Sequence, residues 1–156
     1  MDDVEEIKKL KARYFRSLDA KDWEVYRAVF ADDVVVDLRR AGGELFTGVE
    51  DFMAYASTLK IVQSVHQGHM PEIDVTSETT ATGVWSLEDY NIWDDGTQNH
   101  GWGHYLETYE KRGDRWYIKT MKLSYLRLER SFGTPPMIAG IDQVGHLRGA
   151  QPAAKG

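Results

Sequence analysis

The hydrophobic pattern of this chain changes near residue 61, and this change limits the folds that the chain can adopt. Before it, apolar residues recur at helical spacing in the stretches 4–18 and 49–59. After it, the stretches up to residue 129 are typical of strands, with turn residues at 77–78, 94–98 and 113–114. Helices first and long antiparallel strands afterwards predict an α+β domain: a cone-shaped α+β barrel whose curved antiparallel or mixed sheet packs on N-terminal helices.

Shorter elements complete this expected domain, which we place at residues 1–130. A second helix is expected within 21–30, a strand within 32–40, and an irregularity near Lys122 in the last strand. Residues 131–156 are rich in Gly, Pro and Ala, which predicts an irregular C-terminal tail. This tail is expected either to fold over a pocket as a lid or to be partly disordered.

Composition excludes several classes of function. The 156 residues suffice for one domain with its own core. The net charge of −6, without a long cluster of Lys and Arg, argues against nucleic acid as a partner. The absence of cysteine excludes disulfides and thiolate zinc sites. No signal peptide and no segment long enough to span a membrane is present, so we expect a cytoplasmic protein without a membrane partner.

Strand alternation places a carboxyl group on an apolar face. In the stretch 83–93, Asp89 shares its face with Trp85 and Leu87. A carboxylate in such surroundings must be hydrogen-bonded, or its pKa must rise. Asp89 is therefore either a strand-end residue that holds a backbone amide or an Arg, or a functional acid.

Four histidines fall on two predicted strands and raise the question of a metal site. His66 and His69 are three residues apart, so a straight strand points them to opposite faces, while His100 and His104 share one face. No helical H-E-x-x-H motif accompanies them. We therefore expect no bound metal, and the acid–base interpretation of His66 is the stronger one.

The strand at 98–112 is unusual because glycines alternate with bulky residues. His100, Trp102 and His104 share one face, and Gly101 and Gly103 leave the other face without bulk. Glycine inside a strand indicates a bend or the close approach of another part of the backbone. The histidines here are either satisfied by neighbours or directed toward a pocket.

Asp19 lies at the C-terminal end of the first helix, where the helix dipole disfavours a carboxylate. A solvated Asp is the ordinary interpretation of such a position. A buried Asp19 would instead orient His66 as a general base. Tyr14, about one turn earlier, would then offer its phenol to a developing oxyanion.

Four segments together resemble the SnoaL-like branch of the nuclear transport factor 2-like superfamily. They are YFRSLDAKDW (14–23), VHQGH (65–69), SETTATGVWSLEDY (77–90) and YEKRGDRWYI (109–118). The resemblance runs from Ile7 to Arg130. It is strongest to bile acid 7α-dehydratase, through GHMPEIDVTSETTATGVWSLED (68–89). It is more distant to scytalone dehydratase, through RSLDAKDWEVYRAVF (16–30), and to hexachlorocyclohexane dehydrochlorinase.

This resemblance implies a deep apolar pocket and, in the lyases of the branch, an Asp–His pair that works without a cofactor. The catalytic positions that it implies are Asp19, His66, Tyr14 and Asp89. The positions expected to bind substrate are Trp85, His100, Trp102, His104 and Arg127. The sequence departs from scytalone dehydratase by having Leu18 and Leu38 where that enzyme has tyrosines, which argues against the same reaction.

The function expected from these residues is elimination of water from a hydrophobic cyclic small molecule, such as a steroid or polyketide. Two alternatives stay open: an isomerase of a ketosteroid-like substrate that uses the same pocket, and a binding protein without catalysis. The resemblance further implies a homo-oligomer, with a trimer expected and a dimer as the alternative.

Overall fold

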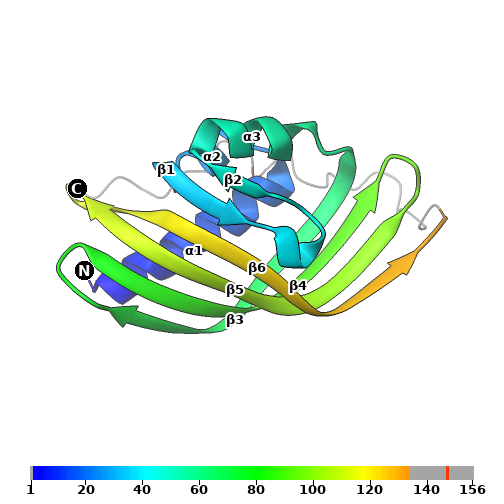
Figure 1. Ribbon diagram of the computed structural model, residues 1–156. Helices are drawn as coiled ribbons and strands as arrows, with labels where there is room; N and C mark the ends of the chain where they lie inside the picture. Colours follow the sequence, from blue (N-terminus) through cyan, green and yellow to red (C-terminus); the bar gives the residue numbers. More distant parts are fainter. Residues whose placement is uncertain (1, 134–146, 148–156) are drawn as a thin grey trace.

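The computed structural model describes residues 2–133 and Leu147. Within this part, three α-helices and one 3-10 helix accompany a mixed sheet of six strands in the order β2-β1-β6-β5-β4-β3. The strands bend into a trough whose concave side holds the helices (Figure 1). The α+β cone predicted from the sequence is confirmed.

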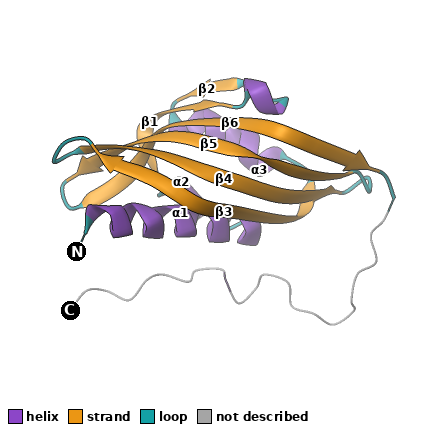
Figure 2. Cartoon of the chain, turned by 90° about the horizontal axis from the view of Figure 1, so that it is seen from below, coloured by secondary structure: helices purple, strands orange, loops and turns teal. Residues whose placement is uncertain are grey.

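The first helix, α1 (Asp3–Ala20), has clear end signals. The side chain of Asp2 accepts a hydrogen bond from the Val4 amide at the start, and Lys21 takes a left-handed conformation at the end, with φ of 54°. Its apolar face is buried against the sheet, and it runs beside β3 (Figure 2). The helices α2 (Trp23–Arg27) and α3 (Val49–Thr58) lie further along the concave side.

The sheet is antiparallel except where its first and last long strands meet. The strands are β1 (Phe30–Asp37), β2 (Leu45–Thr47), β3 (Ile61–Val75), β4 (Thr80–Trp93), β5 (Gln98–Arg112) and β6 (Arg115–Ser131). The pair β1–β6 is parallel, and the 3-10 helix η1 (Arg39–Ala41) follows β1. This pairing brings the start of the chain's β region beside its end.

The sequence predicts a short strand at 61–69 and a separate hairpin arm at 70–76, but the structure has one long strand, β3, through both. The pairing with β4 continues through an irregularity between His69 and Glu72, where Met70 has a positive φ of 40°. Gly68 does not bend the strand. A Cβ at this position would lie 2.7 Å from the ring of Phe15, so Gly68 permits the close approach of α1.

The last strand has two irregularities, which flank the expected position at Lys122. The register shift between Trp102 and Gly103 leaves Leu126 as the extra residue of β6, and the shift between Thr108 and Tyr109 leaves Lys119. A β-bulge of this kind exchanges the faces of the residues that follow it. The bulge at Leu126 therefore decides which residues near the end of β6 face the helices.

Aromatic rings fill the trough between the helices and the sheet. Tyr26 contacts Tyr14 and Phe30, and Phe30 contacts Phe52, with ring centroids 5.1–5.4 Å apart. A cavity remains beside these rings, between the helices and the segments 61–66, 89–93 and 121–130. The core thus forms the floor of a pocket.

Two further predictions concern the C-terminal tail and the absence of a membrane-spanning segment. The tail predicted at 131–156 lies, apart from residues 131–133 and Leu147, outside the described residues. Within the described part of the chain, no helix combines the length and the apolar character needed to cross a membrane.

Candidate active site

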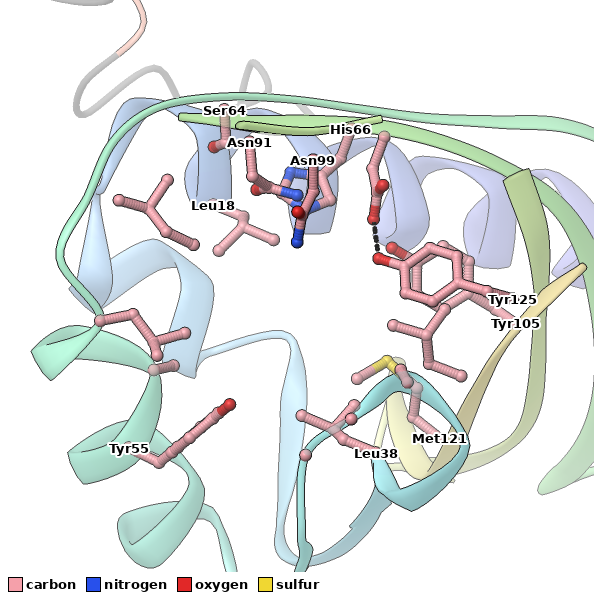
Figure 3. A pocket seen from close by; sticks show the side chains of 18 of the residues that line it. Leu18, Leu38, Tyr55, Ser64, His66, Asn91, Asn99, Tyr105, Met121 and Tyr125 are labelled. Carbon is pink, nitrogen blue, oxygen red and sulfur yellow. Dashed lines mark hydrogen bonds between the residues drawn. The ribbon is translucent and has the colours of Figure 1, made fainter. Parts of the chain in front are cut away.

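The cavity on the concave side has a volume of about 570 Å³, which suits a small cyclic compound. Figure 3 shows Leu38 and Met121 on its lower wall and Ser64, His66, Asn91 and Asn99 along its upper wall. The apolar lining includes Leu18, Leu38, Leu59, Met121 and Leu123. Leu18 and Leu38, which the sequence resemblance set against tyrosines of scytalone dehydratase, thus both line the cavity.

Asp19 and His66 meet at the upper wall. The Nδ1 atom of His66 lies 2.6 Å from Oδ1 of Asp19, and the backbone N–H of His66 donates to Oδ2 at 2.9 Å. The hydroxyl of Ser64 donates to Oδ1 at 2.9 Å. These three donors satisfy the carboxylate at the helix end, where the dipole alone would disfavour it.

The contact between the two side chains fixes the tautomer of a neutral imidazole. A carboxylate only accepts hydrogen bonds, so Nδ1 of His66 carries a proton, and in the neutral ring Nε2 keeps the lone pair. His66 lines the cavity with 11% of its side chain exposed. The pair therefore holds the imidazole in one orientation at the cavity, as a general base requires.

A second acid–base group lies next to this base. Asp89 is the register partner of His66 on β4, is 2% exposed, and accepts a hydrogen bond from the hydroxyl of Tyr125 (dashed line at Tyr125 in Figure 3). Burial raises the pKa of Asp89, against the opposing effect of the Tyr125 hydrogen bond. Asp89 is thus suited to hold a proton beside His66.

Gly101 makes room for this second group. It is the β5 partner of Asp89, and a Cβ at Gly101 would lie 2.7 Å from Oδ1 of Asp89 and would collide with the ring of Tyr125. The glycine pattern noticed in the sequence therefore has a structural cause. Bulk is missing on this face because a carboxyl group and a phenol occupy the space.

Tyr14 also lines the cavity, but its hydroxyl is occupied. It interacts with the hydroxyls of Tyr26 and Tyr105, and all three phenols are buried. Burial raises the pKa of Tyr14 well above its ordinary value. The phenol is thus a weak acid that belongs to a hydrogen-bonded cluster at the floor of the cavity.

Comparison with known proteins identifies the family of this chain. A model of the SnoaL-like domain matches residues 1–122. The chain belongs to the SnoaL-like domain family. The expected place in the SnoaL-like branch of the nuclear transport factor 2-like superfamily is confirmed, whereas the stronger similarity to bile acid 7α-dehydratase stays a prediction.

Individual proteins are similar to this chain over most of its length. The chain is 23% identical over 137 residues to "Probable cyclase FGR4" of Gibberella zeae. The matched region covers 77% of this chain and 89% of that protein. Its fold matches a type 2 hexachlorocyclohexane dehydrochlorinase, LinA, with a TM-score of 0.78 and 15% identity, over 89% of this chain and 95% of that one.

It also matches a "Putative Scytalone Dehydratase" of Novosphingobium aromaticivorans, with a TM-score of 0.73 and 20% identity, over 89% and 94% of the two chains. At these identities the two structural likenesses show a common fold.

Several residues expected to bind substrate lie away from the cavity on the concave side. Trp85 shares the inner face with Asp89, as the alternation predicted, but it lies further along the trough, where its indole donates to the hydroxyl of Tyr109. Strand alternation gives the face of a residue and not its position along the strand. Trp85 therefore belongs to the core.

The outer face of the sheet takes the other expected binding residues. His100 lies 2.9 Å from a carboxylate oxygen of Glu88, and its ring packs on Trp102 at 4.0 Å between centroids. His104 shares this face by alternation. This placement corrects the expectation that His100 or His104 faces the pocket, because Gly101 and Gly103 occupy the inner face.

The placement of Arg127 is corrected for a different reason. Its guanidinium pairs with Glu129 and lies 6.0 Å from the ring of Trp102 on the outer face, although Arg127 is also among the residues that border the cavity. The bulge at Leu126 turns Arg127 outward. Arg130 occupies the inner side instead, where its Nε donates to Oδ1 of Asn99.

Sequence reasoning missed most polar residues of the cavity wall, among them Ser64, Asn91, Asn99 and Tyr125. The alternation did place Asn91 on the face of Asp89, and it places Asn99 on the face of Gly101, so both were accessible to the pattern. Tyr125 was not, because its partners depend on the register between β5 and β6.

The described residues contain no group of three or more His, Cys, Asp or Glu that could hold a metal ion. His66 and His69 point to opposite faces of β3, as the spacing predicted, and His69 is exposed.

Proposed function

We propose that this protein is a cofactor-independent lyase of the dehydratase type that acts on a hydrophobic cyclic small molecule. The observation that supports it most directly is the Asp19–His66 pair, which orients the imidazole at a cavity beside the buried carboxyl group of Asp89, whose pKa burial raises. Two of the similar proteins are named for eliminations, one of water and one of hydrogen chloride. A third is named as a cyclase.

The proposed reaction uses both groups. Nε2 of His66 takes a proton from a carbon next to a carbonyl or conjugated system, and the electrons of the broken C–H bond form the new C=C bond. The C–O bond breaks, and the departing oxygen receives the proton of Asp89 and leaves as water. The His66 imidazolium then returns its proton to the neighbouring Asp89 carboxylate, which restores both groups.

Asp19 and the apolar walls support these steps. Asp19 holds the imidazole in the reactive tautomer and stabilises the imidazolium that forms. The apolar lining excludes bulk water, so charges that develop in the transition state interact more strongly with the fixed polar groups. The cavity volume admits a bicyclic or tricyclic ring system more easily than a larger one.

The test is turnover of β-hydroxy ketones built on tetralone, decalone and steroid rings, with product mass recording the loss of water. His66→Ala and Asp19→Asn are each expected to lower kcat by about 10²- to 10⁴-fold, because general acid–base catalysis contributes that much. His100→Ala is the matched control, since it removes an outer-face imidazole, and it should change kcat by less than about twofold. A fully active His66→Ala variant would rule out the mechanism, and a product of unchanged mass would indicate an isomerase instead.

A further inference from the structure

A row of polar residues crosses the sheet beside the base. Asn91 on β4 pairs with Asn99 on β5, and Asn99 pairs with Arg130 on β6. We call Asn91, Asn99 and Arg130 the amide row. Figure 3 shows Asn91 and Asn99 on the same wall of the cavity as His66. Both amides are nearly inaccessible from outside, with 6% and 8% exposure, although both line the cavity.

Asn91 has an unused hydrogen-bonding atom in this wall. Its Oδ1 is fully buried and, among the residues that the structure describes, has no hydrogen-bond partner. Buried polar atoms in native proteins are almost always paired, because an unpaired one loses its bonds to water without replacement. An unpaired side-chain oxygen in the wall of a cavity therefore points to a partner on the ligand.

Asn99 is held in one orientation by its neighbour. The Nε–H of Arg130 donates to Oδ1 of Asn99 at 3.0 Å, and a guanidinium cannot accept a hydrogen bond. The Oδ1 position of Asn99 is therefore assigned by chemistry, and its Nδ2 is the free end. Within residues 2–133 this Nδ2 has no recorded hydrogen-bond partner. The amide row thus offers an acceptor from Asn91 next to a donor from Asn99.

We propose that the amide row binds a hydroxyl group that stays on the substrate. A hydroxyl donates one hydrogen bond and accepts others, so it pairs with Asn91 Oδ1 and Asn99 Nδ2 at the same time. A carbonyl or carboxylate only accepts, and with the Asn91 amide oriented as it is in the structure it would leave the Asn91 oxygen unpaired. The substrate class is therefore a hydrophobic ring compound that carries a ring hydroxyl in addition to the group that leaves.

The position of the amide row separates this hydroxyl from the reacting carbon. Asn91 lies two residues from Asp89 along β4, which corresponds to about 6.6 Å in a strand. His66 and Asp89 form the neighbouring rung of the sheet. A group bound by the amide row is thus about one ring away from the proton that His66 removes. This inference rests on the proposed function and names the substrate class of the same site.

The test measures binding of probes that cannot react. α-Tetralone and its derivatives hydroxylated on the aromatic ring have no hydroxyl that can be eliminated, so calorimetric titration reports affinity alone. At least one hydroxytetralone is expected to bind wild-type protein about tenfold more tightly than α-tetralone, because it satisfies a buried acceptor. In Asn91→Leu this ratio is expected to fall to about threefold or less.

Two further variants keep the result interpretable. Asn91→Ser retains a small polar side chain that is too short to reach the hydroxyl of the probe. It should therefore lose the preference for hydroxytetralone over α-tetralone, and it keeps the test valid if Asn91→Leu fails to fold. Tyr90→Phe is the matched control: Tyr90 is the adjacent residue on the opposite face, its hydroxyl donates to Gln98, and its loss should leave the ratio unchanged.

Equal binding of all the tetralones by wild-type protein, including no detectable binding, would overturn the proposal, and so would full discrimination by Asn91→Ser. These outcomes leave the His66→Ala turnover result untouched, so failure of the subsite and failure of the dehydratase mechanism are distinguishable.

Discussion

The two faces of β4 and β5 both carry a basic side chain paired with a carboxylate, but the inner pair is buried and the outer pair is partly exposed to water. On each face a basic side chain lies beside a carboxylate: Lys11 of α1 with Glu107 on the inner face, and His100 with Glu88 on the outer face. The inner side chains are 0% exposed, and the outer ones are 35% and 40% exposed. The difference teaches that charged groups buried on the inner face need a partner within the protein, whereas those of the outer face can be hydrated instead.

The inner pair is embedded in a polar network. The Nζ atom of Lys11 lies 2.5 Å from Oε1 of Glu107, and the hydroxyl of Tyr109 donates to Oε2 at 2.5 Å. The ammonium also lies 3.6 Å from the ring centroid of Tyr105. Burial lowers the pKa of Lys11 to about 8, against the opposing effect of Glu107.

The largest expected effect is on this inner pair. Lys11→Met leaves the carboxylate of Glu107 buried without its cation, so the free energy of unfolding should fall by about 3–5 kcal/mol. Glu88→Gln, which weakens the outer pair, should change it by less than about 1 kcal/mol. Urea unfolding of both variants measures the contrast, and equal losses would refute it.

A double variant sharpens the same comparison. Lys11→Met with Glu107→Gln removes both charges and keeps an acceptor for Tyr109, so much of the lost stability should return. If the double variant is as unstable as Lys11→Met, the loss comes from packing rather than from the unpaired charge.

The next effect concerns the space that the inner face keeps for Asp89 and Tyr125. Gly101→Ala should displace both side chains, lower the free energy of unfolding by about 1–3 kcal/mol and strongly reduce turnover. Gly113→Ala is the control: Gly113 has a positive φ of 59° but nothing within 4 Å, so strain alone costs about 1 kcal/mol there and turnover stays. Wild-type turnover by Gly101→Ala would show that the close packing is not needed.

The smallest effect is a dependence on pH. Burial raises the pKa of Asp89 in the folded state above its ordinary value of 3.8, so the folded protein binds this proton more tightly than the unfolded chain. The stability that Asp89 contributes is therefore complete at low pH, and it is lost as pH rises through the folded pKa.

Asp89→Asn stays neutral and lacks this dependence. Between about pH 4 and pH 8 it should gain stability relative to wild type, by about 1.4 kcal/mol for each unit by which the pKa is raised. Unfolding free energies measured across this interval test the sign, and a difference that does not vary with pH would contradict it.

Local pattern was enough to predict the architecture and part of the site. Helical and strand periodicities gave the order of the elements, and alternation gave the inner face of Asp89. The Asp19–His66 contact was expected from the family resemblance, since 47 residues separate the two side chains. Spacing along the chain could allow that contact but could not establish it.

The remaining features depend on pairings between distant segments. Lys11 and Glu107 are 96 residues apart, and nothing in either segment signals the other. Tyr125 reaches Asp89 only through the register of β6 against β5. The outward turn of Arg127 follows from a bulge that simple alternation does not contain. Such features can be predicted only once the pairing of the strands is known, because the pairing determines where the extra residue of the bulge lies.

That bulge at Leu126 makes one point of a long strand tolerant of a change in length. Deleting Leu126 would restore regular alternation and still leave Tyr125 and Leu128 facing inward and Arg127 facing outward. Relatives that differ here by one residue can therefore keep the same cavity wall. An alignment that forbids gaps within strands would pair the wrong arginine with this wall, so a gap at position 126 is the physically correct way to compare them.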